Sequence, residues 1–177
     1  MPRQACGCVR HAHWGRRGFL RGAGAGLMVA GLAPFARAAS GSYEAMLFAC
    51  IDPRFVDPAH EFMTKAGLDH RYSQVNLAGA AVAVEAPAFE AWRQTYWDNL
   101  GTSVQLHGIS RVIVVDHRDC GAAEIAFGED VVKDPDKETA AHRQTLMNFR
   151  DEVAKRFPQL GVEGYLMALD GTSLKLV

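Results

Sequence analysis

The stretch SRVIVVD, residues 110–116, is the clearest strand of the chain and the starting point for its fold. Its continuous run of β-branched residues is typical of a strand that is buried on both faces of a parallel sheet. A second apolar run, residues 45–49, precedes Cys50, just as the first precedes His117 and Cys120. All three side chains therefore follow strand ends, which in an open parallel sheet meet at the switch point where active sites are usually built.

These three side chains are a ligand set for zinc. Two thiolates and one imidazole leave a tetrahedral zinc ion one position for water or substrate, which is the pattern of a catalytic site. A disulfide between Cys50 and Cys120 is the alternative, because cysteine pairs in oxidising compartments usually form one. His117, three residues before Cys120, and the neighbouring Asp52 and Arg54 favour the metal, since a plain disulfide needs none of them.

Strands and helices alternate along the rest of the chain. Further strands are expected at residues 43–49, 74–77, 164–169 and 173–177, and helices at residues 58–66, 87–107, 121–127 and 139–157. Residues 128–137 are charged, contain a proline and are expected to form a loop. This order predicts an α/β domain with a mainly parallel central sheet of about four to five strands flanked by helices.

The two long helical segments carry apolar residues at roughly helical spacing, and these are predicted to lie in the core. They are Phe89, Trp92, Tyr96, Trp97, Leu100, Val104 and Leu106 in the first segment, and Leu146, Phe149, Val153 and Phe157 in the second.

The N-terminal segment has the features of an export signal. Paired arginines at 16–17 precede a weakly apolar run, residues 22–32, and then an Ala-Arg-Ala motif that ends at Ala38. The apolar run is too short to span a bilayer, and the paired arginines resemble a twin-arginine (Tat) signal. We therefore expect residues 1–38 to be a Tat signal peptide cleaved after Ala38, and residues 39–177 to be a single domain that is periplasmic or otherwise exported by the Tat machinery.

The charge balance changes when this segment is removed. The 177 residues carry a formal net charge of −1, with 49% hydrophobic and 22% charged residues, the profile of a globular protein. The first 38 residues hold six arginines and no acidic residue, so 13 basic residues remain against 20 acidic ones, a formal charge of −7. This balance argues against nucleic acid as a partner.

The residues after Cys50 place an acid and a base beside it. In an extended segment, side chains two residues apart point the same way, so Cys50, Asp52 and Arg54 are expected to share a face. Pro53 favours this, because the residue before a proline is biased toward an extended conformation. Arginine can hold a carboxylate by two parallel hydrogen bonds, which fixes its orientation and keeps it ionised.

Taken together, these motifs resemble a β-class carbonic anhydrase. The resemblance covers the chain from about residue 46 to residue 177. It rests on four motifs in order: Cys-x-Asp-x-Arg at 50–54, Asn-Leu-Ala-Gly-Ala at 76–80, His-x-x-Cys-Gly at 117–121, and Gly164-Tyr165 followed by Asp170-Gly171. The two motifs that carry the metal ligands are the most specific of these.

The resemblance implies roles for the site residues. Cys50, His117 and Cys120 would bind Zn²⁺, and Asp52 and Arg54 would be the dyad of the family. The implied reaction is the reversible hydration of carbon dioxide to bicarbonate by zinc-bound hydroxide, because zinc lowers the pKa of its water to about 7. Ala78 and Gly79 would line an apolar substrate pocket. A homodimer or higher homo-oligomer is expected.

Some alternatives stay open at this point. The same ligands could serve a zinc hydrolase acting on carbonyl sulfide or carbon disulfide, or a non-catalytic zinc-binding or redox protein that uses its two cysteines. Proton-shuttle candidates are identified only by residue type, and each is expected to be structural or at the surface: His60, His70, His107 and His142. Two positions depart from the family pattern, since Asp116 replaces a usual glycine and Pro53 a usual serine or alanine.

Overall fold

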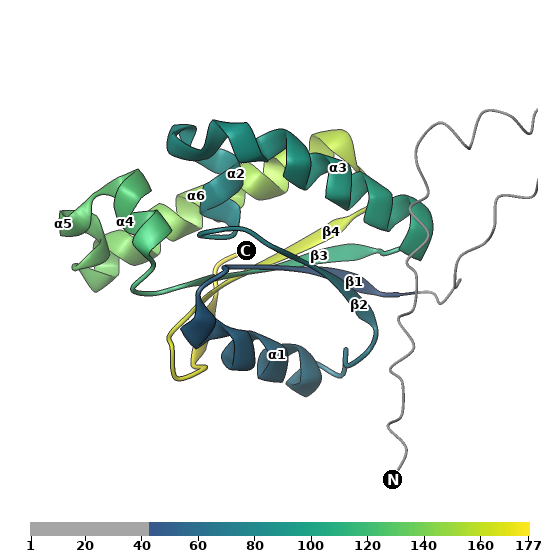
Figure 1. Cartoon of the computed structure of the whole chain (residues 1–177), viewed down its shortest axis with the longest axis horizontal. Coiled ribbons are helices and arrows are strands. Elements are labelled where there is room, and N and C mark those ends of the chain that lie inside the picture. The colour runs from purple at the N-terminus through teal and green to yellow at the C-terminus, as the bar shows by residue number, and fades with distance from the viewer. Residues whose placement is uncertain (1–42) are drawn as a thin grey trace, which may run out of the picture. The chain divides into compact units, whose positions relative to one another are not determined.

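The computed structural model describes residues 43–177, which form one sheet of five strands covered by helices on both faces (Figure 1). The strands are β1 (Ala45–Ala49), β2 (Tyr72–Asn76), β3 (Arg111–His117), β4 (Gly161–Met167) and β5 (Ser173–Lys175). Their order is β2-β1-β3-β4-β5, and only β5 pairs in the antiparallel direction. The predicted α/β class and mainly parallel sheet are therefore confirmed.

The register of the two central strands sets the place of the site. Ala49 pairs with Val115 in the parallel ladder of β1 and β3. Cys50, which follows β1, and His117, which ends β3, therefore lie at the same carboxyl end of the two strands. The chain leaves β1 toward β2 on one side and leaves β3 toward β4 on the other. The strand order thus reverses between β1 and β3, which is the switch point predicted from the sequence.

The helices form a layer on each face of the sheet. Helix α1 (Val56–Lys65) lies on one face, and α3 (Glu90–His107) and α6 (Pro135–Arg156) lie on the other (Figure 1). Shorter elements complete the chain: α2 (Ala81–Glu85), α4 (Gly121–Phe127), α5 (Glu129–Val132), and the 3-10 helices η1 (Pro53–Phe55) and η2 (Pro87–Phe89).

Each face of the sheet buries its own apolar cluster. Leu47 of β1 packs into the cluster that includes Met63 of α1, whereas the next residue, Phe48, packs into the cluster with Tyr96 and Phe149. Because both faces are covered, β1 and β3 contain continuous apolar runs, residues 45–49 and 112–115, rather than apolar residues at alternate positions.

Most of the predicted core residues are buried, two (Val104 and Phe157) are partly buried, and two are exposed. Leu146, Phe149 and Val153 of α6 are fully buried as predicted. Trp92 and Leu106 of α3 are 40% and 55% exposed, so their prediction as core residues was wrong. The helix buries one side only, and these two residues lie outside that side.

One local prediction was wrong, and one helix was not predicted. Residues 128–137 are not a loop, because they contain α5 and the start of α6. Asp134 caps α6 by accepting hydrogen bonds from the backbone N–H groups of Asp136 and Lys137, and Pro135 occupies the first turn, where proline is favoured. Helix α2 was not predicted: its five residues are too few for a periodic signal, and four of them are buried.

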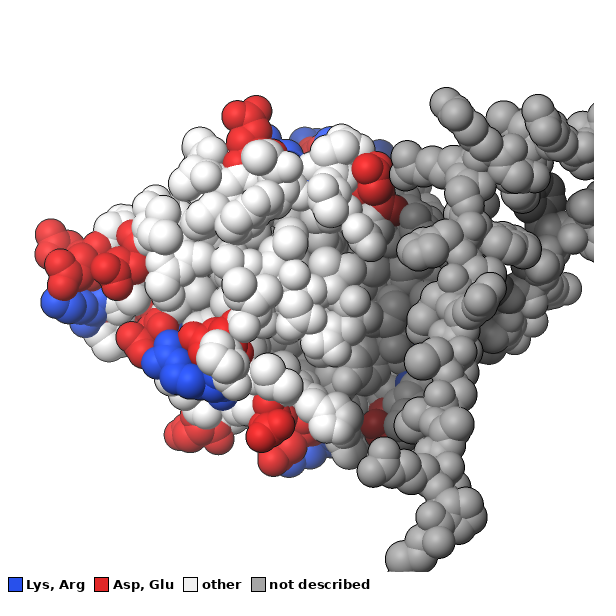
Figure 2. Space-filling view, viewed as in Figure 1, with Lys and Arg blue, Asp and Glu red and all other residues white. Residues whose placement is uncertain are grey.

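Charged side chains on one face lie around its margin, while the middle of the face is uncharged (Figure 2). Within residues 43–177, no helix has the length and apolar character needed to cross a bilayer. The predicted signal peptide, residues 1–38, lies outside the described residues and stays a prediction.

Candidate metal centre

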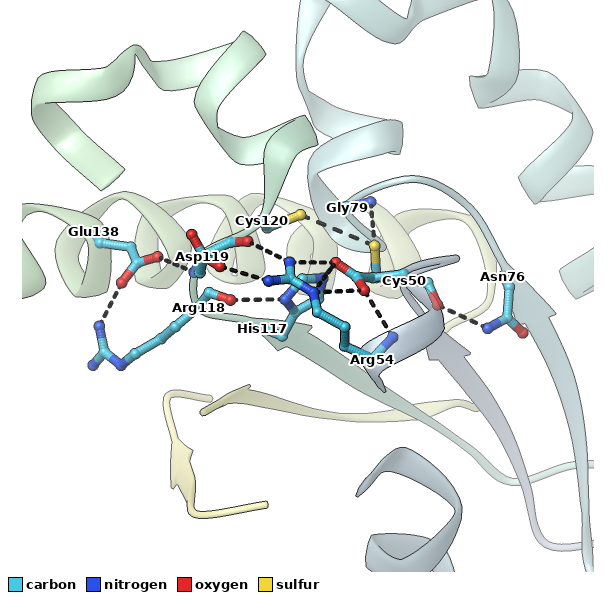
Figure 3. Close-up of polar contacts among 10 residues, drawn as sticks. Cys50, Arg54, Asn76, Gly79, His117, Arg118, Asp119, Cys120 and Glu138 are labelled. Carbon is cyan, nitrogen blue, oxygen red and sulfur yellow. Dashed lines mark hydrogen bonds and ion pairs between the residues drawn. The ribbon is translucent and has the colours of Figure 1, made fainter. Parts of the chain in front are cut away.

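The three predicted ligand side chains converge at the edge of the sheet (Figure 3). Cys50 follows β1, His117 ends β3, and Cys120 immediately precedes α4. One ligand atom from each lies within 4.8 Å of the others, and all three residues are buried. The structure therefore brings together the residues that the sequence predicted; their role as metal ligands stays a prediction.

The ring of His117 is oriented for metal binding. Its Nδ1 lies 2.8 Å from the carbonyl oxygen of Arg118, which can only accept, so Nδ1 carries the hydrogen and donates it. This leaves Nε2 as an unprotonated nitrogen in the neutral ring, and Nε2 is buried without a hydrogen-bond partner among the described residues. A metal-binding histidine typically has this arrangement, with one ring nitrogen anchored and the other free.

The distance between the two sulfur atoms suits a shared metal better than a disulfide. Cys50 Sγ and Cys120 Sγ lie 4.0 Å apart, and both cysteines are free. Two sulfurs bound to a tetrahedral zinc at about 2.3 Å would lie about 3.8 Å apart, whereas a disulfide needs about 2.05 Å. The donor set and its spacing therefore fit zinc.

The two thiols titrate as a pair. A hydrogen bond from Cys120, together with one from the backbone N–H of Gly79, lowers the pKa of Cys50 far below that of an ordinary thiol. The hydrogen bond to Cys50 and burial raise the pKa of Cys120 well above the ordinary value. Without metal, the two sulfurs therefore share one proton.

Asp52 and Arg54 form a tight ion pair at the mouth of the site. Arg54 Nε donates to Asp52 Oδ1 at 3.0 Å, and its Nη2 donates to Asp52 Oδ2 at 2.7 Å. These hydrogen bonds lower the pKa of Asp52 to about 2. Asp52 Oδ2 lies 3.9 Å from His117 Nε2, which places the carboxylate beside the ligand cluster.

The backbone that presents this pair differs from the prediction. The segment after Asp52 is not extended, because residues 53–55 form the 3-10 helix η1. Asp52 itself has φ −57° and ψ 124°, the conformation favoured before a proline, and caps η1 through a hydrogen bond from the backbone N–H of Arg54. The side chains of Asp52 and Arg54 are therefore brought together by a capped turn, and not by lying on one face of a strand.

The segment between His117 and Cys120 is fixed by charged residues that the sequence did not single out. Arg118 Nη1 donates to Glu138 Oε2 at 2.6 Å, and the backbone N–H of Asp119 donates to Glu138 Oε1 at 3.2 Å. Glu138, in the first turn of α6, is only 3% exposed. Asp119 accepts a hydrogen bond from Arg54 Nη1 at 2.7 Å, so Arg54 joins the two halves of the site.

Gly79 contacts the site through its backbone. Its N–H donates to Cys50 Sγ at 3.1 Å, and its φ of +85° favours glycine. A Cβ atom at this position would lie 2.9 Å from the Cβ of Ala122, so no larger residue fits. Ala78 is partly buried against the core cluster on the α1 side of the sheet. The roles of Ala78 and Gly79 in a substrate pocket stay predictions.

A second acid–base pair lies behind the ligands. Asp116 and His142 have fully buried side chains, and His142 Nδ1 lies 2.8 Å from Asp116 Oδ2. His142 was expected to be structural or at the surface, and its partner was not foreseen. Its position one turn before Leu146, on the buried stripe of α6, was the available signal.

Comparisons with known proteins agree with this geometry. Residues 41–169 match a protein family described as "Putative carbonic anhydrase". An uncharacterized protein of Rickettsia conorii is 36% identical over 126 residues, which cover 71% of this chain and 68% of that protein. A second, from Rickettsia bellii, is 35% identical over 126 residues that cover 71% and 77% of the two chains.

Solved structures of carbonic anhydrases share the fold. A carbonic anhydrase from Glaciozyma antarctica matches with a TM-score of 0.50 and 14% identity, covering 80% of this chain and 88% of that one. A mutant β-carbonic anhydrase from Aspergillus fumigatus matches with a TM-score of 0.50 and 11% identity, covering 81% and 94%. At this level of identity the likeness shows the fold alone.

Proposed function

The chain belongs to the carbonic anhydrase family that its sequence matches, and from this membership we propose that it catalyses the reversible hydration of carbon dioxide to bicarbonate. The proposed cofactor is one zinc ion held by Cys50, His117 and Cys120. The observation that carries the proposal is the geometry of this buried cluster, whose ligand atoms lie within 4.8 Å of one another beside the Asp52 carboxylate.

The residues present fit a catalytic zinc ion. They offer three ligands, including an anchored imidazole with its Nε2 unpartnered among the described residues. A tetrahedral ion held by three protein ligands keeps one position for another molecule. When bound, zinc would supply a nucleophile at neutral pH by lowering the pKa of water to about 7.

Asp52 would orient the attacking water. Its carboxylate is ionised across the neutral range, because Arg54 lowers its pKa to about 2, so it can accept a hydrogen bond but not donate one. Arg54 holds the carboxylate with hydrogen bonds to both oxygens and restricts its rotation. An oriented acceptor fixes the direction of the water's lone pair toward the carbon of the substrate.

The test measures metal and activity together. Purified residues 39–177 are analysed for zinc content and for carbon dioxide hydration between about pH 6 and pH 9, because a nucleophile with a pKa near 7 is available there. We expect about one zinc per chain and hydration that a chelator abolishes and zinc restores. Zinc-loaded protein without hydration activity would contradict the proposal, and turnover of carbonyl sulfide or carbon disulfide in the same assay would identify a related hydrolase.

We also propose that the protein is exported by the Tat route and cleaved after Ala38. The paired arginines at 16–17 and the Ala-Arg-Ala motif support this proposal. Expression in a bacterium with and without functional Tat transport, followed by N-terminal sequencing, tests it. Mature protein that starts elsewhere, or export that survives replacement of both arginines by lysine, would contradict it.

A homo-oligomer is proposed on the character of the surface. The middle of the face in Figure 2 is uncharged, and several large apolar side chains are exposed. They are Ile51, Val56, Trp92, Leu106, Ile125, Met147 and Leu174. A surface with few charged residues in its middle and charged residues around its margin is typical of an interface between proteins. Light scattering during size-exclusion chromatography should give a mass of at least two chains, and a monomer at micromolar concentration would contradict the proposal.

A further inference from the structure

The buried carboxylate of Asp116 connects three elements of the fold. Its Oδ1 accepts a hydrogen bond from the backbone N–H of Ala81, at the start of α2, at 3.1 Å. Its Oδ2 accepts from Nδ1 of His142, on α6, at 2.8 Å. Asp116 itself lies on β3, directly before His117. One side chain therefore fixes β3, α2 and α6 relative to one another.

Two of these three elements, β3 and α2, adjoin the metal centre. His117, the next residue, supplies the imidazole ligand. Ala81 lies two residues after Gly79, whose N–H donates to Cys50 Sγ at 3.1 Å. A displacement of either element would therefore move a ligand or the hydrogen bond to a ligand.

The loop before Ala81 needs such an anchor, because its backbone is strained. Ala80 has φ +47°, a conformation that residues other than glycine rarely adopt, and it is fully buried. Strained backbone persists only where the surrounding structure fixes it. The hydrogen bond from Ala81 to Asp116 is the side-chain contact that does so on the C-terminal side of Ala80.

We propose that Asp116 and His142 are positioning residues that hold the loop around Gly79 and the end of β3 in their metal-binding geometry before metal arrives. The inference rests on one part of the proposed function, which is that Cys50, His117 and Cys120 bind a metal. Partners that orient metal ligands from outside the ligand set typically change metal affinity by about 10- to 100-fold when they are lost.

The first experiment compares zinc affinities of folded variants by competition with a chromophoric chelator. His142→Leu removes the donor to Asp116 while keeping an apolar side chain of similar size, and we expect zinc affinity to fall about 10-fold or more. His142→Asn keeps an N–H donor near the position of Nδ1 and should restore most of the loss. Thr145→Val is the matched control, because this buried hydroxyl bonds only to a carbonyl of its own helix, and it should bind zinc like the wild type.

The absorption spectrum of the cobalt-substituted protein gives a second readout. A purely structural role would lower the unfolding midpoint of His142→Leu but leave its zinc affinity and cobalt spectrum unchanged, and that result would overturn the proposal. We expect instead that the spectrum of His142→Leu shifts and that of His142→Asn returns toward the wild type.

A measurement on the wild type keeps the proposal falsifiable even if His142→Leu does not fold. Hydrogen exchange followed by NMR should show slow exchange at the Gly79 and Ala81 amides in the metal-free, reduced protein. Fast exchange that becomes slow only after zinc is added would show that the pair does not hold the loop. Wild-type protein that binds no zinc would instead refute the proposed function, so the two failures are distinguishable.

Discussion

Asp52 and Asp116 are each paired with a basic side chain, and the surroundings of the two pairs differ. Asp52 is paired with Arg54, whose side chain is 51% exposed, at the mouth of the ligand cluster. Asp116 is paired with His142, and both side chains are completely buried behind the cluster. Asp52 lies next to the ligand atoms, whereas Asp116 reaches them only through the backbone of its neighbours.

The difference indicates that the position of each aspartate, rather than its residue type, decides whether its role is chemical or structural. An exposed ion pair contributes little to stability, so the arrangement of Asp52 and Arg54 is better explained by its proposed role beside a bound metal. A buried pair is costly to disrupt, because loss of one partner leaves the other unpaired in a low dielectric. Variants of each pair test this comparison, because the effect on activity and the effect on stability can be measured separately.

The largest effect is expected from Asp52→Asn. The amide removes the charge and an acceptor beside the metal, and loss of such a group typically lowers turnover by about 10² to 10⁴-fold; we expect about 10³-fold. Zinc content and the urea unfolding midpoint should stay close to those of the wild type. Metal analysis, denaturation and hydration kinetics check all three, and unchanged turnover would contradict the role assigned to Asp52.

Asp116→Ala should have the opposite profile. It leaves the Ala81 N–H and the His142 ring without their partner, and loss of one member of a buried pair costs about 3 kcal/mol. Equilibrium denaturation in urea measures this loss. A variant as stable as the wild type would show that the buried pair contributes no more than the exposed one, and would remove the contrast between them.

The pH dependence of zinc affinity tests the ligand residues themselves, which lie between the two aspartate pairs. Because burial and the hydrogen bond between the two sulfurs favour a shared proton in the thiol pair, zinc must displace this proton when it binds. Affinity should therefore rise with pH, by about tenfold per pH unit for one released proton, and fall as pH is lowered. Calorimetry in buffers of different ionisation enthalpy counts the protons, and a count of zero at pH 7 would contradict the assignment.

The smallest effect is expected from Arg54→Lys. Lysine keeps the positive charge but cannot hold both oxygens of Asp52 in the planar geometry of a guanidinium, so the carboxylate would be less well oriented. Turnover should fall only a few-fold. This fold-change is roughly a tenth or less of the fold-change expected for Asp52→Asn. A loss as large as that of Asp52→Asn would instead assign Arg54 a direct part in the chemistry.

The sequence predicted what depends on local pattern. The buried run of β3 and the candidate metal ligands after β1 and β3 were readable because strand period, strand ends and ligand type are properties of short segments. The three ligand residues and the Asp52–Arg54 pair follow from such segments. The switch point between β1 and β3 followed from the alternation of strands and helices.

What the sequence did not predict depends on contacts between distant segments. Asp116 and His142 are 26 residues apart, and no periodic pattern pairs an acid at a strand end with a histidine in a later helix. Helix α2 has five residues and is stabilised by its surroundings, including the bond from Arg93 Nε to the carbonyl of Val84. Pro135 indicated a loop, although its position after Asp134 also suits the start of a helix.

The parallel pairing of β1 with β3 has a consequence for how the protein would respond to the loss of a bound metal. The segments that carry Cys50 and His117 are joined by the main-chain ladder of the sheet, and Arg54 bridges them again through Asp52 and Asp119. Small zinc-dependent domains unfold when their ion is removed, because the ion supplies the folding energy. Here the main-chain ladder and the Arg54 bridge join the two segments without the ion, so we expect that loss of a bound ion would abolish the proposed activity without unfolding the domain, and that the same polypeptide could bind zinc again.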